Sequence, residues 1–200
     1  MKKIIIALTF LLGNVTMMIA QNAQAVLDKC AAVVSSKDGV KASFTMESAQ
    51  YGNASGTIAV KGKMFHATTA VATMWFDGKT QWTYLSKNDE VSVTTPSAEQ
   101  QQMLNPYNFI NMYKSGYKST MTTTGNSYNV HLTAKDKKHK IQEMFITIDK
   151  KSSVPSEVKV RQGSRWTTFT ISNLKHEKLA DSEFRFNSKD FPKAEVIDLR

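Results

Sequence analysis

The stretch Met74-Trp75-Phe76-Asp77-Gly78-Lys79-Thr80-Gln81-Trp82-Thr83-Tyr84 decides the fold class of this chain. An Asp-Gly pair readily adopts the positive φ angles of a primed turn. The residues on both sides of Asp77-Gly78 are aromatic, β-branched or apolar types that favour strands. The stretch therefore predicts a β-hairpin with its turn at Asp77-Gly78.

The same two-residue period extends in both directions from this hairpin. Apolar residues alternate with polar ones in Ala42-Phe44-Met46, Ile58-Val60, Val91-Val93, Tyr128-Val130-Leu132, Met144-Ile146-Ile148, Val158-Val160 and Phe169-Ile171. Such alternation predicts strands with one buried face. The turns between them are short and polar, including the basic run 135–140, so we expect antiparallel pairing.

Two segments depart from the strand pattern. Residues 24–34 carry apolar side chains near helical spacing and end at a Ser-Ser-Lys-Asp-Gly stop, which predicts an opening helix. Ser97 to Leu104 has a serine cap with Gln100 three residues later, and Pro106 to Tyr113 adds further apolar residues. We expect a short, apolar helical insert in the middle of the sheet.

The first residues predict a cleaved secretory signal peptide. Lys2 and Lys3 precede an uncharged apolar run from Ile4 to Ile19, which is too short for a membrane span. Cleavage after residue 20 or after residue 25 fits the small residues there. We therefore expect a signal peptide over residues 1–20, or 1–25, and a single domain over residues 21–200 in the periplasm.

Composition narrows the partners of that domain. The formal charge of +9 falls to +7 when Lys2 and Lys3 leave with the signal peptide. A basic balance favours anionic surfaces such as lipid headgroups, and it also suits nucleic acid. The aromatic residues are paired on hairpins rather than interleaved with basic ones, so we expect transient membrane-surface contact and no nucleic acid. With Cys30 as the lone cysteine, the domain has no internal disulfide.

These elements predict a mainly β (α+β) fold. A long antiparallel sheet with an opening helix and an apolar insert suits an open, strongly curved half-barrel whose helices plug the concave side. Seven methionines fall after the signal peptide. Their flexible thioethers suit either a surface that accepts irregular apolar ligands or ordinary packing in a core.

In order and spacing, these segments resemble the periplasmic outer-membrane lipoprotein carrier family, LolA. The resemblance rests on the 74–84 hairpin followed by Val91-Ser92-Val93 and the insert, on Lys41-Ala42-Ser43-Phe44-Thr45 after the opening helix, and on the closing 184–198 segment. It implies a half-open β-barrel with a helical lid. It also implies a carrier that ferries acylated lipoproteins from an inner-membrane lipoprotein-releasing transporter toward an outer-membrane acceptor, as a monomer.

The resemblance assigns two groups of apolar residues to this task. The expected lid residues are Met103, Leu104, Phe109, Ile110, Met112 and Tyr113. The expected cavity-lining residues are Phe44, Met46, Phe65, Trp75, Trp82, Tyr84, Ile146 and Trp166. Residues 60–65 correspond to the stretch that carries an Arg-Pro pair in the family, and they contain neither residue. Because the family's arginine holds the lid closed, Lys61 or Lys63 is the expected substitute donor.

Residue patterns typical of catalysis are missing from the sequence. The four histidines are far apart and none has metal-ligand spacing to another histidine or to Cys30. The sequence also lacks a nucleophile elbow, a phosphate-binding glycine loop and a dinucleotide fingerprint. We expect no enzyme activity, no metal and no cofactor. The alternative to a carrier is a lipid-sensing or protein-binding envelope domain on the same open barrel, since fold alone does not separate the two.

Overall fold

The structure is a computed structural model that describes residues 23–97, 100, 112–114 and 116–200. A helix covers residues 23–34. The strands are β1 (Val40–Ser48), β2 (Gly52–Lys61), β3 (Met64–Thr69), β4 (Ala72–Phe76), β5 (Gln81–Leu85), β6 (Glu90–Thr94), β7 (Tyr117–Thr124), β8 (Ser127–Ala134), β9 (Ile141–Asp149), β10 (Pro155–Gln162), β11 (Arg165–His176) and β12 (Glu195–Asp198). Three 3-10 turns are η1 (Met112–Lys114), η2 (Asp181–Phe184) and η3 (Ser188–Asp190).

The twelve strands of the described residues form one sheet, in the order β12-β6-β5-β4-β3-β2-β1-β11-β10-β9-β8-β7. Strands β1–β6 and β7–β11 are two meanders of sequential antiparallel hairpins. They join where β1 pairs antiparallel with β11, from Val40 opposite His176 to Ser48 opposite Thr167. The one departure from the antiparallel prediction is β12, which runs parallel to β6.

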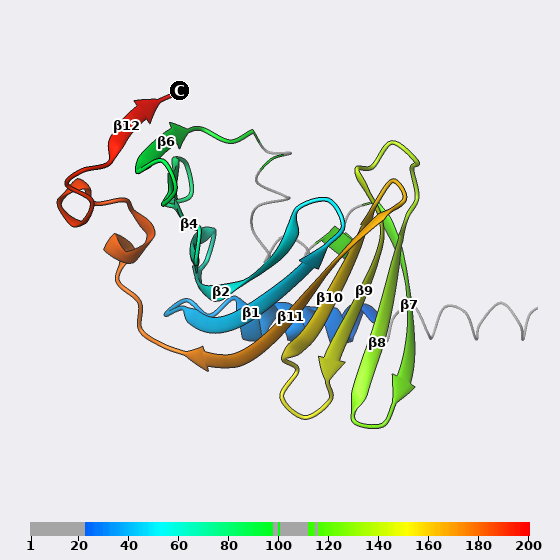
Figure 1. Cartoon of the computed structure of the whole chain (residues 1–200). Coiled ribbons are helices and arrows are strands. Elements are labelled where there is room, and N and C mark those ends of the chain that lie inside the picture. Colours follow the sequence, from blue (N-terminus) through cyan, green and yellow to red (C-terminus); the bar gives the residue numbers. More distant parts are fainter. Residues whose placement is uncertain (1–22, 98–99, 101–111, 115) are drawn as a thin grey trace, which may run out of the picture.

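The sheet is strongly curved and its two edge strands, β12 and β7, do not meet (Figure 1). The β4–β6 end and the β7–β9 end rise on opposite sides of the molecule, with β1 and β2 at the bottom of the curve (Figure 1). The predicted open half-barrel with an N-terminal helix is therefore confirmed.

The hairpin at Asp77-Gly78 forms, although its turn differs from the one predicted. Phe76 pairs with Gln81, so the loop has four residues. Gly78 has φ +97°, while Asp77 is not among the residues with positive φ. The Asp77 carboxylate instead accepts hydrogen bonds from the backbone N–H groups of Lys79 (3.0 Å) and Thr80 (2.8 Å). Asp77 thus stabilises the turn through its side chain, as aspartate commonly does in turns.

Strand alternation divides the sheet into two faces, which we call inner and outer. The inner face carries Phe65 paired with Phe76, and Val130 paired with Ile146. The helix packs on the β7–β11 half of this face, where Leu27 and Cys30 join a fully buried core with strand residues such as Met144. Leu174 on β11 touches both this core and the β1–β4 cluster around Phe65, so the inner face is continuous.

The outer face of the other half is covered by the C-terminal segment. This segment follows β11 and runs along the outside of the β3–β6 half, drawn in orange and red in Figure 1. Phe184 of η2 is fully buried and packs with Ala59 and Leu179. Phe191 lies against Trp75, with ring centroids 5.5 Å apart. The segment then ends as β12 on the sheet edge.

Candidate functional site

The inner positions of β1–β4 form a surface without charged side chains. Register places these residues on it: Val40, Ala42, Phe44, Met46 and Ser48 of β1, Ile58 and Val60 of β2, Phe65, Ala67 and Thr69 of β3, and Ala72, Met74 and Phe76 of β4. The charged residues of these strands, such as Lys41 and Lys61, stand at outer positions. An uncharged concave surface of this kind suits a hydrocarbon ligand.

Burial separates this surface into a closed part and a partly open part. Phe65 and Phe76 are 2% and 3% exposed and form the floor of a small core cluster. The residues around them, Ile58, Ala67 and Met74, are only half-buried. Phe44 and Met46 on β1 are half-buried as well. The partly open apolar area therefore lies on β1–β4, beside the half of the inner face that the helix fills.

Met112 and Tyr113 lie at the helix-covered side of this area. Tyr113 is buried, packs in the helix core, and donates a hydrogen bond from its hydroxyl to the Asp28 carboxylate. Burial and this hydrogen bond together raise the pKa of Tyr113 well above its usual value. The remaining predicted lid residues, Met103, Leu104, Phe109 and Ile110, lie outside the described residues.

The predicted insert begins with the expected pairing of Ser97 and Gln100. The Ser97 backbone N–H donates to Gln100 Oε1 at 2.8 Å, and the Gln100 N–H donates to Ser97 Oγ at 3.3 Å. This reciprocal pair is a capping box, the arrangement that a serine followed three residues later by glutamine predicts.

The predicted cavity-lining residues fall on both faces. Phe44, Met46 and Phe65 lie on the open half of the inner face, and Ile146 lies on the inner face beneath the helix. Trp75 pairs directly with Trp82, and both stand on the outer face. Tyr84 is also on the outer face, with its ring 4.6 Å from Phe191. Trp166 lies on the outer face of β11, opposite Arg161.

The predicted lining residues fall on both faces because successive side chains along a strand point to opposite faces. Trp75 is flanked by the inner-face residues Met74 and Phe76, so its own side chain must point the other way. Hydrophobicity alone does not show this, because the C-terminal segment also buries the outer face. Ala67 and Met74 are two further inner-face residues outside the predicted lining, although their spacing of two from Phe65 and Phe76 was the signal for them.

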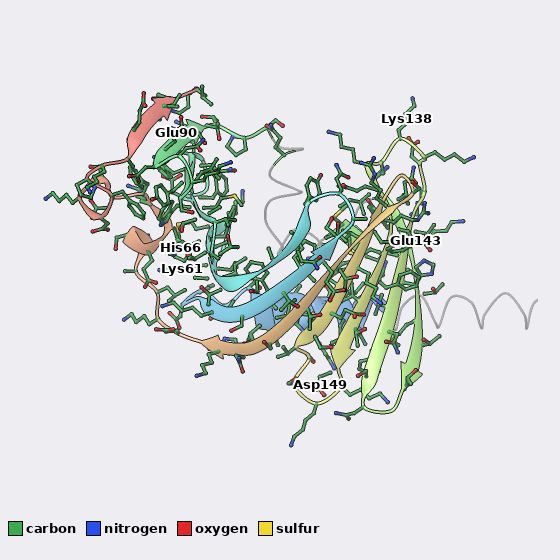
Figure 2. The ribbon with its side chains drawn as sticks, viewed as in Figure 1. Lys61, His66, Glu90, Lys138, Glu143 and Asp149 are labelled. Atoms are coloured by element: carbon green, nitrogen blue, oxygen red, sulfur yellow. The ribbon has the colours of Figure 1, made fainter. Side chains whose placement is uncertain are left out.

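Lys61, one of the two donors expected to hold the lid, forms its hydrogen bonds with the C-terminal segment instead, and we call this pair of bonds the Lys61 clasp. Its ammonium donates to the Leu179 carbonyl at 2.7 Å and to the Asp181 carboxylate at 2.8 Å. Lys61 stands on the outer face beside His66, next to that segment (Figure 2). These bonds therefore fasten the C-terminal segment to β2.

Groups suited to metal or nucleophilic chemistry do not gather in the described part of the chain. Within residues 23–97, 100, 112–114 and 116–200, no three His, Cys, Asp or Glu side chains are placed to hold a metal ion. Cys30 is fully buried in the helix core, and burial raises the pKa of its thiol to about 12. A thiol with such a pKa is inert at neutral pH.

Comparison with known families identifies the fold. The sequence profile of the outer-membrane lipoprotein carrier protein LolA matches residues 15–164. The chain belongs to the LolA family. In this LolA-family chain, the helix covers one half of the inner face of the open sheet, and the other half presents the uncharged concave surface. A search of curated proteins gives no match to the chain.

Solved structures agree with the LolA-family fold at low sequence identity. An uncharacterised conserved protein from Thermus thermophilus superposes with a TM-score of 0.59 and 12% identity, over 88% of this chain and 99% of that one. A DUF1329 family protein from Desulfovibrio piger gives 0.50 and 12%, over 84% and 97%. MucB gives 0.50 and 10%, over 84% and 64%. At these identities the likeness concerns the fold alone.

Among the residues that the structure describes, no helix combines the length and the hydrophobicity that crossing a bilayer requires. The predicted signal peptide, residues 1–20 or 1–25, lies almost wholly outside the described residues.

Proposed function

We propose that this LolA-family chain is a periplasmic carrier that binds the acyl chains of lipoproteins on the inner face of β1–β4. The observation that supports the proposal is the uncharged, half-buried surface of Phe44, Met46, Ile58, Ala67 and Met74, set in a curved sheet of the carrier family. The chain acts by binding and release rather than by catalysis.

The energetics favour such a surface. Each methylene removed from water contributes about 0.8 kcal/mol, so a chain of roughly sixteen carbons is held in a membrane by about 12 kcal/mol. A carrier must supply most of that burial and still release its cargo. Inner-face side chains that are already half-buried provide a moderate gain on binding, because part of their surface has left the water before the ligand arrives.

Membership in the LolA family supports a proposed route for the cargo. The proposed cargo is an acylated lipoprotein, received from a lipoprotein-releasing transporter at the inner membrane and delivered to an acceptor at the outer membrane. The domain over residues 21–200 acts as a monomer after removal of the signal peptide. A lid formed by the apolar residues between Met103 and Tyr113 would cover the same inner surface when it is empty, so that net affinity is the difference between ligand burial and lid burial.

A fluorescent fatty acid tests the binding face directly. Met46 and Thr45 are neighbours on β1, and their side chains stand on the inner and outer faces respectively. Met46→Asp should weaken uptake of a dansyl-labelled undecanoic acid at least tenfold, because it places a carboxylate against the hydrocarbon. Thr45→Asp, at an exposed outer position, should bind like the wild-type chain. Equal affinities for all three proteins would refute the assignment of the inner face.

Depletion of the protein tests the cellular role. Lipoproteins should then accumulate in the inner-membrane fraction of the envelope. A lipid-sensing domain would leave lipoprotein distribution unchanged while still binding the fatty acid. A protein-binding domain would leave the distribution unchanged without binding the fatty acid, so the two experiments together separate the carrier from both alternatives.

A further inference from the structure

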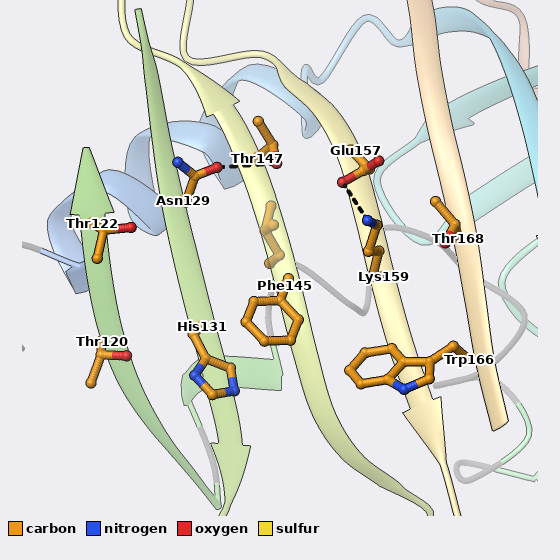
Figure 3. Close-up of a pocket in the computed structure, with 11 residues that line it drawn as sticks. Thr120, Thr122, Asn129, His131, Phe145, Thr147, Glu157, Lys159, Trp166 and Thr168 are labelled. Atoms are coloured by element: carbon orange, nitrogen blue, oxygen red, sulfur yellow. Dashed lines mark hydrogen bonds and ion pairs between the residues drawn. The ribbon is translucent and has the colours of Figure 1, made fainter. Parts of the chain in front are cut away.

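The outer face of β7–β11 holds a hollow that the carrier function does not use. It has a volume of about 750 Å³ and is open to solvent. Figure 3 shows the side chains that line it, which come from the five adjacent strands β7 to β11. They stand on the face opposite the helix core.

Two of these side chains are unusual for a solvent-facing strand position. Phe145 and Trp166 are each 37% exposed, although their neighbours on this face are mostly threonine or charged residues. The C-terminal segment, which covers Trp75, packs on β2, β3 and β4 of the other half of the outer face. The two rings are neighbours, so they expose one contiguous apolar patch on a polar face, a feature typical of interaction sites.

The aromatic side chains form a fixed row across the strands. The His131 and Phe145 rings are stacked with centroids 4.2 Å apart, and the Phe145 and Trp166 centroids are 5.8 Å apart. The Arg161 guanidinium lies 5.9 Å from the Trp166 ring centroid. Glu143 accepts hydrogen bonds from both ends of the row, from Arg161 at 2.7 Å and His131 at 2.7 Å. The row is therefore held in place before any ligand arrives.

Hydroxyl and amide groups surround this row. The hydroxyls of Thr120, Thr122 and Thr168 make no hydrogen bond to another residue of the described chain. Asn129 accepts a long hydrogen bond of 3.4 Å from Thr147 and donates one of 3.2 Å to Thr124 at the edge of the hollow. The nearby ions are paired, Lys159 with Glu157 at 3.5 Å, so the hollow has no excess of either charge.

We propose that this hollow binds a neutral saccharide, such as a short stretch of hexose or N-acetylhexosamine units. The C–H groups of a pyranose ring carry a slight positive charge and pack against the negative faces of aromatic rings, here Phe145 and Trp166. The sugar hydroxyls exchange hydrogen bonds with the threonine hydroxyls, the Asn129 amide and the Glu157–Lys159 pair. A volume of about 750 Å³ accommodates roughly two or three such units.

The alternative ligands fit this chemistry less well. An acyl chain would leave the threonine hydroxyls, Asn129 and the ion pair without water or partners, which is costly. A phosphate or another anion would meet the carboxylates of Glu157 and Glu143 as well as the cations paired with them, Lys159 and Arg161. The inference does not depend on the proposed carrier function, because it concerns the opposite face of the sheet.

The test uses the full mature chain and three probes: maltotetraose, cellotetraose and the tetramer of N-acetylglucosamine. Titration of ¹⁵N-labelled protein should give saturable amide shifts at residues of β9 and β11 for at least one probe. Trp166→Ala should weaken that binding at least tenfold, and Phe145→Ala should do the same, because both remove ring surface from the site.

Thr170→Ala is the matched control. Thr170 lies on the same strand and face as Trp166 and Thr168 but outside the hollow, and it should bind like the wild type. The inner-face variant Met46→Asp should also retain saccharide binding, which distinguishes this site from the carrier site. Absence of saturable shifts with all three probes, or wild-type affinity in Trp166→Ala and Phe145→Ala, would overturn the proposal.

Discussion

The Tyr113 hydroxyl donates a hydrogen bond to the Asp28 carboxylate, which joins η1 to the N-terminal helix across 85 residues of sequence. Tyr113 is 6% exposed, so its hydroxyl depends on this partner. Tyr113→Phe should lower the free energy of unfolding by about 1 kcal/mol, which corresponds to a Tm lower by about 3 °C in a domain of this size. Thermal unfolding followed by circular dichroism measures the change.

Tyr128 supplies the control for that substitution. Its ring packs against the same core and beneath the Lys150 ammonium, while its hydroxyl has no hydrogen-bond partner among the described residues. Tyr128→Phe should therefore leave the Tm unchanged. If the two variants lost the same stability, the Tyr113–Asp28 bond would have no special part in fixing the helix.

The Lys61 clasp predicts a local effect on the C-terminal segment. Lys61→Met removes the hydrogen bonds to the Leu179 carbonyl and to the Asp181 carboxylate. Losing a charged hydrogen bond of about 1.4 kcal/mol corresponds to roughly tenfold faster local opening. Hydrogen exchange should accelerate by that factor in residues 177–190 and remain unchanged in β8 and β9. Acceleration throughout the sheet, or none at all, would contradict the clasp.

The Glu143 carboxylate predicts a dependence of stability on pH. Burial opposes its ionisation, but hydrogen bonds from Arg161 and His131 outweigh burial and hold its pKa below the usual value. A lowered pKa means that this carboxylate stabilises the fold above about pH 4.5, its usual pKa, and that the contribution disappears as the pH falls through the lowered value. Glu143→Gln should cost about 1.5 kcal/mol at pH 7 and much less at pH 3.

Urea unfolding at the two pH values measures this difference. Arg161→Met, which removes the first hydrogen-bond donor, should also lose stability at pH 7 and approach the wild type at pH 3. A loss for Glu143→Gln that is as large at pH 3 as at pH 7 would show that the effect comes from packing rather than from the charge.

Local features of the fold were predictable from the sequence because their causes are local. Alternation located most of the strands, and the serine and glutamine at positions 97 and 100 located a capping box that the structure contains. The basic run 135–140 is the loop between β8 and β9, with Lys138 at its tip (Figure 2). The helix that buries Cys30 was visible in the spacing of its apolar residues.

Features that depend on distant partners were not predictable in the same way. The alternation of β7 was missed because its inner residues, Ser119 and Met121, are less hydrophobic than those of its neighbours. The parallel pairing of β12 with β6 has no local signal. Trp75 was expected in the cavity because it is large and apolar, yet the cover over its face comes from Phe186 and Phe191, more than a hundred residues later.

The seam between β1 and β11 also governs how the chain reaches this structure. Each meander consists of neighbouring hairpins that form quickly. The pairing of Val40 with His176 joins residues far apart in the sequence, so it forms only after most of the chain has been synthesised. Until then β1 has an open edge with Phe44 and Met46 beside it. Folding should accordingly be slow, on the order of milliseconds to seconds. The partly folded chain should be most prone to aggregate just before the two meanders pair, because β1 then has an unpaired edge.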